Sequence, residues 1–495
     1  MKVIKGLFVL ISALILVSTL PITLESCGAQ EIIQCKKLTP PDQGVCSVIS
    51  GGNSLLISGN ILAPSEIYIG GDILIKEGLI ACVGCDCVGN TQDKPTRIIC
   101  ANGVVSPGLI NAHDHLSYDH SYPGSWGNER FDQRNDWRLG KRGHTKLSYE
   151  NNSDPLKIAW SELRQLISGT TSIAGSTGTK GLLRNLDIGS MQEGLKPVKI
   201  LNHVFPLGDG KSGTQLERGC DYPQIDGTDV IDNNDCYLPH VAEGVDPVAH
   251  NEFVCLSGQA KGAVNLISKK TALIHAIALN EADAKILRDN STTVVWSPRS
   301  NISFYGKTAP VTMYDSLGIN IALSTDWTIS GSMSLLREMK CVDYLNKYHF
   351  NNHFSDCKIW RMITANAAVG LAVGDRIGFL KPNYVADVVI LNGSSVTNYY
   401  RAVIEADWKD IVLVLRAGIP LYGDKEPMAL IPNGQSGCED IIVNGCSDNK
   451  INKTGCINRE TGHSFKDLVD ANKDSYPLFY CQTPFNEPSC FPTRP

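Results

Sequence analysis

The chain has 495 residues, of which 42% are hydrophobic and 19% charged, and its formal net charge is −6. This is an ordinary globular composition, and the length allows one large domain with smaller modules. Because the net charge is small and no basic stripe stands out, the sequence argues against nucleic-acid binding and favours small-molecule chemistry.

Residues 1–30 have the composition of an export signal. Two lysines precede an apolar run at 6–20, and a proline and small polar residues follow it. The run is near the lower length limit of a membrane span, so an uncleaved anchor is an alternative. The Leu-Glu-Ser-Cys sequence at 24–27 also resembles a bacterial lipoprotein cleavage box, in which Cys27 would carry the lipid. We expect a protein that is secreted, periplasmic or membrane-anchored outside the cytoplasm.

The chain contains 17 cysteines, which is many for a cytosolic enzyme. In an oxidising compartment they are expected to form disulfides, so the cysteine count and the export signal support each other. The total is odd, and loss of Cys27 by cleavage or lipidation would leave an even number. Cys82 and Cys85 have the spacing of half a zinc ribbon, but without a second such pair disulfides are favoured.

Both ends of the folded chain are predicted to form β-structure. Between residues 55 and 87, short apolar and β-branched runs are broken by glycines, which predicts small antiparallel strands. A similar texture returns at 386–391 and 411–418. We expect the two ends to form one β-sandwich that flanks the middle of the chain.

The middle of the chain alternates strand-like runs with helical stretches, which is the pattern of parallel α/β architecture. A helix is predicted over 155–168, and later strands over 272–275, 293–297 and 319–324. The predicted fold class is α/β, with a (β/α)8 TIM-like barrel whose polar strand ends gather at one face.

Two polar segments interrupt this pattern. The segment 208–235 is rich in Gly, Asp and Asn and is predicted to be a loop insertion pinned by Cys220 and Cys236. After residue 432 the chain is polar and rich in cysteine, without a recognisable series of strands. The expected division is a signal peptide or lipoprotein anchor at 1–30, sandwich segments at 31–106 and 381–431, a barrel at 107–380, and a disulfide-rich extension at 432–495.

The sequence His113-Asp-His115 follows an apolar run that begins at Pro107. On a strand, two histidines at this spacing point to the same side. Two neutral imidazoles at a strand end can hold Zn²⁺ at about 2.0–2.1 Å. The apolar strand before them would deliver the pair to the mouth of the barrel.

Further candidate residues end the later strands. His240 and Glu243 form an HxxE pair, and His275 ends an apolar run. A lone histidine at the end of a buried strand is more often structural, but the order of these residues favours function. Asp326 follows the last strand candidate and supplies a carboxylate that could act as a ligand or a base.

Taken in order, these motifs resemble the amidohydrolase superfamily, in particular its guanine and cytosine deaminases and triazine hydrolases. The resemblance covers about residues 55–421. It rests on the HxH and HxxE strands and the later histidine, together with three further motifs: Ser297-Pro-Arg-Ser-Asn301, Ser324-Thr-Asp326, and a return to the sandwich that contains Ala386-Asp387.

The resemblance implies a ligand set for one divalent metal: His113, His115, His240 and Asp326. Zinc is the expected metal, and nitrogen and oxygen ligands also suit iron. A bound metal can lower the pKa of water from 15.7 to about 7, and Asp326 would accept the proton of that water. Glu243 and His275 would then handle protons beside it. Lys199 precedes its strand, so no lysine is placed to bridge two metals.

Three residues are candidates for substrate binding. Arg299 could meet a substrate carboxylate, although a surface ion pair is the alternative. Trp296 lies on the same strand end, and His203 could reach the pocket or serve a structural role. The loop at 118–142 is rich in Tyr, Trp and Arg and is expected to be either a substrate contact or a solvated lid.

The sequence therefore predicts an exported metal-dependent hydrolase of non-peptide carbon–nitrogen or carbon–halogen bonds, with a deaminase-like mechanism and a small-molecule substrate. A cyclic amide or lactam hydrolase is the alternative, and a non-catalytic surface binding protein is a further one. Membrane attachment through the N-terminus and homo-oligomerisation, which is common in the family, are the partner expectations.

Overall fold

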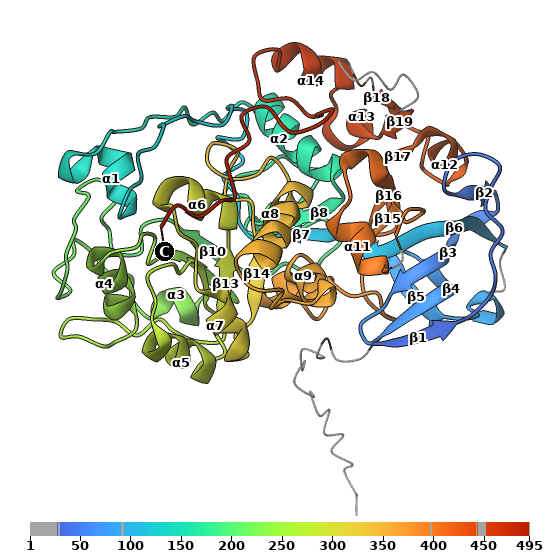
Figure 1. Ribbon diagram of the computed structural model, residues 1–495. Helices are drawn as coiled ribbons and strands as arrows, with labels where there is room; N and C mark the ends of the chain where they lie inside the picture. The colour runs from blue at the N-terminus through green and yellow to red at the C-terminus, as the bar shows by residue number, and fades with distance from the viewer. Residues whose placement is uncertain are drawn as a thin grey trace, which may run out of the picture.

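The computed structural model describes residues 27, 30–90, 94–396, 398–441, 443 and 452–494. Most of the expected export signal therefore lies outside the described residues. The described chain has two parts that lie side by side in Figure 1. One is a set of parallel strands with surrounding helices, and the other is a large mixed sheet built from both ends of the chain.

The large sheet has eleven strands in the order β1-β4-β3-β6-β15-β16-β17-β19-β18, with β2 on β6 and β5 on β4. Its two halves meet where β6 pairs with β15 in antiparallel register, with Val388 opposite Pro107. As the sequence predicts, both ends of the chain share this structure. Its strands are β1 Glu31–Gln34, β2 Ser47–Ile49, β3 Gly52–Leu62, β4 Glu66–Lys76, β5 Leu79–Gly84, β6 Pro95–Pro107, β15 Val388–Asn392, β16 Ile411–Arg416, β17 Ile419–Asp424, β18 Glu439–Ile441 and β19 Lys453–Gly455.

The sheet extends further along the chain than the sequence indicates. Strands β18 and β19 lie after residue 432, in the segment expected to lack strands, and β19 pairs with β17. Each has three residues, which is too short to show the alternation of polar and apolar side chains that identifies a strand.

The other part contains a three-stranded sheet, β7-β8-β9, and a five-stranded sheet, β10-β11-β12-β13-β14, and all of their strand pairs are parallel. The amide of Ala112 after β7 donates to the carbonyl of Leu323 in β14 at 3.2 Å, so the first and last of these strands are neighbours. The strands are β7 Leu109–Asn111, β8 Thr170–Ile173, β9 Arg184–Asn185, β10 Ile200–His203, β11 Cys236–Val241, β12 Ala272–His275, β13 Thr293–Trp296 and β14 Ile321–Leu323.

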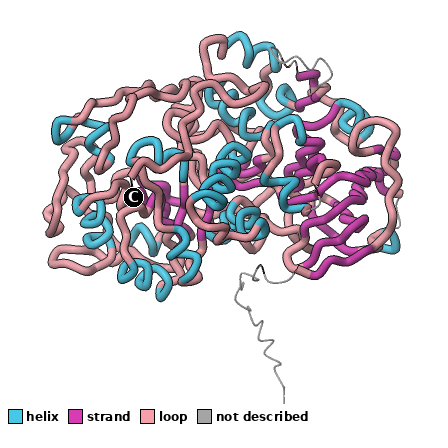
Figure 2. The backbone as a smooth tube through the Cα atoms, viewed as in Figure 1, coloured by secondary structure: helices cyan, strands magenta, loops and turns pink. Residues whose placement is uncertain are grey.

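Helices follow most of these strands and bury them. Helix α2 illustrates the local signals: Asp154 caps it by accepting from the amide of Leu156, Pro155 begins it, and Gly169 turns the chain after it with φ 89°. The helices are α1 Arg134–Leu139, α2 Pro155–Ile167, α3 Asp229–Asp232, α4 Pro247–Leu256, α5 Glu281–Asp289, α6 Pro298–Tyr305, α7 Val311–Ser316, α8 Leu335–Tyr348, α9 Asp356–Met362, α10 Ala365–Gly370, α11 Tyr399–Ile404, α12 Lys425–Leu430, α13 Ile457–Thr461 and α14 Phe465–Ala471. Long loops surround α1, as Figure 2 shows.

Disulfides connect segments that are far apart in the sequence. The described pairs are Cys27–Cys357, Cys35–Cys85, Cys46–Cys100, Cys82–Cys87, Cys220–Cys255, Cys341–Cys490 and Cys438–Cys456. Cys82 and Cys85 have separate partners, which agrees with the preference for disulfides over a zinc ribbon. Several disulfides are compatible with an oxidising compartment outside the cytoplasm.

Two cysteine expectations are corrected. Cys27 pairs with Cys357, so its sulfur is not available for a lipid. Cys220 pairs with Cys255 rather than with Cys236. Among the described cysteines Cys236 is the free one, because it begins β11 and points into the buried interior, where its thiol donates to the carbonyl of Gly370 at 3.3 Å.

The C-terminal extension packs back against α2. The indole of Trp160 donates to the carbonyl of Tyr476 at 2.8 Å, and Arg164 donates to that carbonyl and to Pro477. Figure 1 shows α14 beside α2 accordingly. Within the part of the chain that the structure describes, no helix has the length and apolarity needed to cross a membrane.

Candidate metal centre and active site

Four side chains converge at the carboxyl ends of the parallel strands. His113 and His115 follow β7, His240 lies near the end of β11, and Asp326 follows β14. One ligand atom from each of the four lies within 4.8 Å of the others, and the group could hold a metal ion. The structure thus brings together all four residues that the sequence predicts as ligands.

The spacing of these atoms suits a small tetrahedral cation. Nε2 of His113 lies 3.2 Å from Nε2 of His115 and 3.3 Å from Oδ1 of Asp326, and the His115–Asp326 distance is 3.7 Å. Tetrahedral ligands at about 2.0–2.1 Å from zinc would be separated by about 3.3 Å. Three imidazole nitrogens and one carboxylate oxygen therefore fit a divalent metal in both geometry and chemistry.

The electrostatics of the four residues favour the protonation states that ligation requires. Burial, together with the charge of His113, lowers the pKa of His115 to about 3. The same causes hold the pKa of His240 well below its ordinary value. Burial alone would raise the pKa of Asp326, but the hydrogen bond with His113 and the nearby histidine charges outweigh it and lower that pKa. At neutral pH, His115 and His240 are therefore expected to be neutral and Asp326 ionised, as metal ligation requires.

Asp114 separates the two histidines and points away from them. It is fully buried and accepts hydrogen bonds from Thr325 at 2.5 Å, Asn111 at 2.9 Å and Gln165 at 3.2 Å. Since Thr325 precedes a proposed ligand, this network ties the end of β7 to the end of β14. Asp114 therefore holds the ligands of the first and last strands in register.

The motif Ser297-Pro-Arg-Ser-Asn301 forms the start of α6 and supports two site residues. The hydroxyl of Ser300 donates to Oδ2 of Asp326 at 2.5 Å. Oδ1 of Asn301 lies 3.0 Å from Nδ1 of His275. Because this amide oxygen only accepts, Nδ1 of His275 carries a proton, and the ring is oriented with Nε2 away from Asn301.

Glu243 is held by a tyrosine that the sequence did not single out. The hydroxyl of Tyr305, at the end of α6, donates to Oε1 of Glu243 at 2.6 Å, and the indole of Trp137 donates to that hydroxyl at 3.0 Å. Nε2 of His275 lies 3.8 Å from the same carboxylate oxygen. Tyr305 follows the Ser-Pro-Arg-Ser-Asn motif by one helical turn, which is the signal that could have pointed to it.

The backbone is strained at two of these residues. His275 has φ 71° and Asp326 has φ 66°, in the left-handed region that residues other than glycine rarely adopt. Such strain tends to occur at functional sites, where surrounding contacts enforce it.

The site opens into a cavity of about 480 Å³, within the range of small-molecule sites. The segment between β7 and α2 forms much of its wall. It includes residues 118–142, for which the sequence left open a substrate contact or a solvated lid. The lining residues are His115, Ser117, Tyr118, Arg134, Trp137, Arg138, Lys146, Leu147, Ser148, Tyr149, Asn151, Ser176, Val204, Phe205, His240, Glu243, His275, Asp326 and Trp327.

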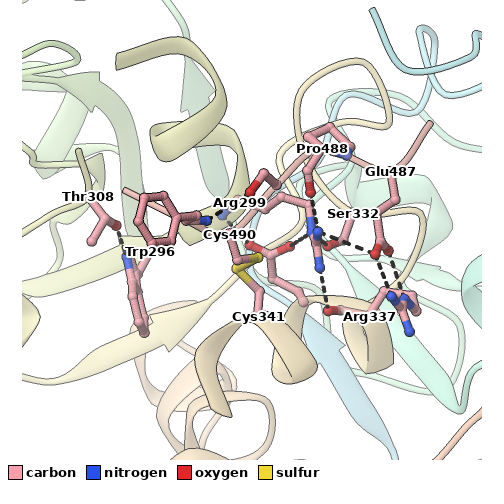
Figure 3. Close-up of a disulfide and its surroundings, with 12 residues drawn as sticks. Trp296, Arg299, Thr308, Ser332, Arg337, Cys341, Glu487, Pro488 and Cys490 are labelled. Atoms are coloured by element: carbon pink, nitrogen blue, oxygen red, sulfur yellow. Dashed lines mark hydrogen bonds and ion pairs between the residues drawn. A yellow bond between two sulfur atoms is a disulfide. The ribbon is translucent and has the colours of Figure 1, made fainter. Parts of the chain in front are cut away.

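The three predicted substrate-binding residues do not line this cavity. Trp296 is fully buried in the core and donates to Thr308 at 2.7 Å. His203 lies 2.6 Å from Asp226 of the insertion. Arg299 donates to Ser332 and to the carbonyl of Pro488, so it anchors the C-terminal tail (Figure 3). All three side chains are engaged by partners within the protein, and none is among the residues that line the cavity.

The sequence model of the amidohydrolase family matches residues 233–419. This part of the chain is similar to the amidohydrolases. The matched region contains His240, Glu243, His275 and Asp326, and it confirms the resemblance inferred from the motifs. His113 and His115 precede the matched region.

Curated relatives of this amidohydrolase-like chain include 5-methylthioadenosine/S-adenosylhomocysteine deaminases. That of Clostridium tetani is 29% identical over 161 residues, which are 31% of this chain and 37% of the relative. That of Syntrophomonas wolfei is 31% identical over 152 residues, which are 30% of this chain and 33% of the relative. The chain thus spans about a third of the length of these relatives. A longer match, to the protein of Desulfitobacterium hafniense, is 25% identical and covers 74% of this chain and 90% of the relative.

Solved structures of an adenosine deaminase and an atrazine chlorohydrolase are similar in fold. An adenosine deaminase from Xanthomonas campestris with bound zinc has a TM-score of 0.53 at 18% identity, covering 77% of this chain and 97% of that one. An atrazine chlorohydrolase from Arthrobacter aurescens, also with zinc, has a TM-score of 0.55 at 17% identity, covering 77% and 99%. At this identity the likeness is one of fold.

Proposed function

We propose that the chain is a metal-dependent hydrolase that removes an amino group from a planar heterocycle. The observation that carries this proposal is the convergence of three histidines and Asp326 beside the Glu243–His275 pair. The names of the curated relatives and the deaminases among the structural neighbours support the same reaction class.

A divalent metal, for which zinc is the expectation, would act as a Lewis acid and favour the ionisation of water at neutral pH. Asp326 accepts the proton of the attacking water, while the hydroxyl of Ser300 holds its other carboxylate oxygen. Glu243, oriented by Tyr305, carries a proton to the departing nitrogen. His275, whose ring is fixed by Asn301, stabilises the charge that develops on the attacked ring.

The cavity wall favours a planar substrate. Tyr118, Trp137 and Trp327 all line it, and Trp137 and Trp327 lie with their ring centroids 5.6 Å apart. Aromatic faces bind flat rings through stacking and edge contacts. Amino-substituted purines and pyrimidines are therefore the first substrates to test.

Two other reactions deserve a direct comparison. Removal of a ring halogen is favoured by the likeness to the atrazine chlorohydrolase, and hydrolysis of a cyclic amide would use the same ligands. A panel of aminopurines, aminopyrimidines, chlorotriazines and lactams, assayed for ammonia, chloride and ring opening, separates the three. Ammonia release is the expected result.

Glu243→Gln tests the mechanism. It should leave the content of bound zinc unchanged and lower turnover by at least about 100-fold, since proton transfer by a positioned carboxylate contributes on that order. A matched control is Glu426→Gln, at an exposed position in α12. Turnover near the wild-type value in Glu243→Gln would contradict the assignment.

The remaining expectations concern architecture and location. We propose that the two parallel sheets close into one (β/α)8 barrel through β7 and β14. A β-sandwich from residues 31–106 and 381–431, extended by β18 and β19, would flank this barrel. The described disulfides support a place outside the cytoplasm. Homo-oligomerisation remains a prediction, which light scattering tests.

A further inference from the structure

One side of the active-site cavity is cationic. Arg134, Arg138 and Lys146 line it, and all three come from the loop between β7 and α2. The acidic residues of the lining, Glu243 and Asp326, belong to the catalytic group already described. The lining therefore carries charges of both signs. Only a cation that has no carboxylate partner within the protein can pair with an anionic ligand.

Arg134 is neutralised within the protein. Its guanidinium lies 3.0 Å from Asp209 and 3.5 Å from Glu252, and it also donates to the carbonyl of Val204. The side chain is buried. Arg134 therefore stabilises the packing of this segment, and its charge is balanced by carboxylates within the protein rather than by a substrate.

Arg138 is different because its partners are neutral. It donates to Oδ1 of Asn135 at 2.5 Å and to the carbonyl of Gly210 at 3.0 Å. Among the described residues it forms no ion pair with a carboxylate. Burial, together with the charge of Arg134, lowers the pKa of Arg138 by more than the more distant carboxylates of Asp209 and Glu243 raise it.

The Arg138 guanidinium is held in position by contacts within the protein, without a ligand. It lies over the ring of Phe205, 4.2 Å from the ring centroid. The insertion that follows Phe205 supplies the carbonyl of Gly210, so two segments that the sequence could not relate to each other build the same subsite. Lys146 is exposed and, in the described part of the chain, forms no hydrogen bond or ion pair.

We propose that the cavity binds a planar heterocycle that carries an anionic group, a carboxylate or a phosphate, paired with Arg138 and assisted by Lys146. A guanidinium matches either anion through two parallel hydrogen bonds. The heterocycle in this proposal rests on the proposed function, whereas the anion rests on the unneutralised cations alone.

Equilibrium binding tests the subsite without turnover. The zinc-loaded protein is titrated with two matched pairs, uracil with orotate and inosine with inosine 5′-monophosphate, and binding is measured by isothermal titration calorimetry. The first pair adds a carboxylate and the second a phosphate. We expect the anionic member of at least one pair to bind about 10-fold tighter or better.

Variants decide whether Arg138 is responsible. Arg138→Gln should abolish that preference and change the affinity for the neutral member by less than about 2-fold, and Arg288→Gln, at a surface position on α5, should keep the preference. Lys146→Gln, at an exposed position, should reduce it about 3-fold. Equal binding of both members of each pair, or a preference that persists in both Arg138→Gln and Lys146→Gln, overturns the proposal. Absence of ammonia release with an intact preference would instead contradict the proposed function.

Discussion

The hydroxyl of Tyr305 donates a hydrogen bond of 2.6 Å to Oε1 of Glu243, and both side chains are buried. Burial, together with the charge of Glu243, raises the pKa of Tyr305 well above its ordinary value, so this hydroxyl is a donor at neutral pH. The carboxylate that is proposed to carry protons therefore has one oxygen fixed by α6.

Tyr305→Phe should lower kcat by about 10- to 100-fold, because a hydrogen bond to a charged group contributes about 1.5–3 kcal/mol. KM should change little, since the tyrosine is not among the residues that line the cavity. Steady-state kinetics on the substrate identified by the panel measure both constants. Tyr237→Phe is the matched control, because Tyr237 donates to a carboxylate, that of Asp226, at 2.6 Å away from the site. Equal loss of kcat in both variants would indicate a general effect of destabilisation.

Ser300→Ala should weaken zinc binding by about 10-fold, because residues that orient metal ligands contribute on that order. The hydroxyl of Ser300 fixes Oδ2 of Asp326, and without it the carboxylate can rotate away from the histidines. Competition with a chromophoric chelator measures the affinity. Ser161→Ala, which removes a buried hydroxyl from α2, should leave zinc affinity unchanged. An unchanged affinity in Ser300→Ala would show that Asp326 is held by other contacts.

The residues at the strand ends could be predicted because their spacing is local. His113 and His115 share a side of one strand, and His240, His275 and Asp326 each follow an apolar run, so sequence order alone suggests one site. Trp296 and Arg299 also lie at the end of a strand, and the same reasoning assigned them to the pocket. The direction of a side chain near the end of a strand depends on how the following helix packs. No short sequence pattern specifies this direction.

The substrate-facing residues could not be predicted for a different reason. Arg138 lies in the short helix α1, and Phe205 and Gly210 lie in a loop after β10. Their contact depends on how that loop folds against α1. The pairing of Cys220 with Cys255 is a similar case. Disulfide partners are set by three-dimensional distance, which spacing along the chain does not determine.

The stability of the metal-free protein should depend on pH. The pKa of His115 is about 3 in the folded chain because of burial and the charge of His113, against 6.5 ordinarily. Between these values the unfolded chain binds a proton that the folded chain excludes, so the free energy of unfolding falls as the pH falls below 6.5. We expect a loss of about 2 kcal/mol from this residue between about pH 7.5 and pH 5.

Urea unfolding of the chelator-treated protein at both pH values checks this dependence. His240, whose pKa is lowered in the same direction, should add to the loss. His115→Asn should make the dependence shallower by the contribution of one histidine, whereas His349→Asn, at the end of α8 and outside the site, should not. Buried carboxyl groups such as Glu162 and Glu252, whose pKa burial raises to about 7, act in the opposite direction, so the comparison of the variant with the wild-type protein carries the test. An identical pH dependence in His115→Asn and the wild-type protein would contradict the protonation state inferred for His115.

The Cys341–Cys490 disulfide should hold the C-terminal tail against the helices that carry the site. Figure 3 shows this bond beside the ion pair of Arg337 with Glu487 and the hydrogen bond from Arg299 to Pro488. Further along, the amides of Thr493 and Arg494 donate to the carbonyl of Gly306, the residue after Tyr305.

Replacing both Cys341 and Cys490 by serine should lower the free energy of unfolding by about 2–4 kcal/mol and make the tail sensitive to limited proteolysis, because the bond closes a loop of 149 residues. The matched control replaces Cys82 and Cys87, which are separated by only 5 residues, and should cost much less. Mass spectrometry of the proteolytic fragments locates the cleavage. Because Tyr305 adjoins the anchored Gly306, release of the tail should also lower kcat. Cleavage at the tail with unchanged kcat would show that α6 holds Tyr305 without help from the C-terminus.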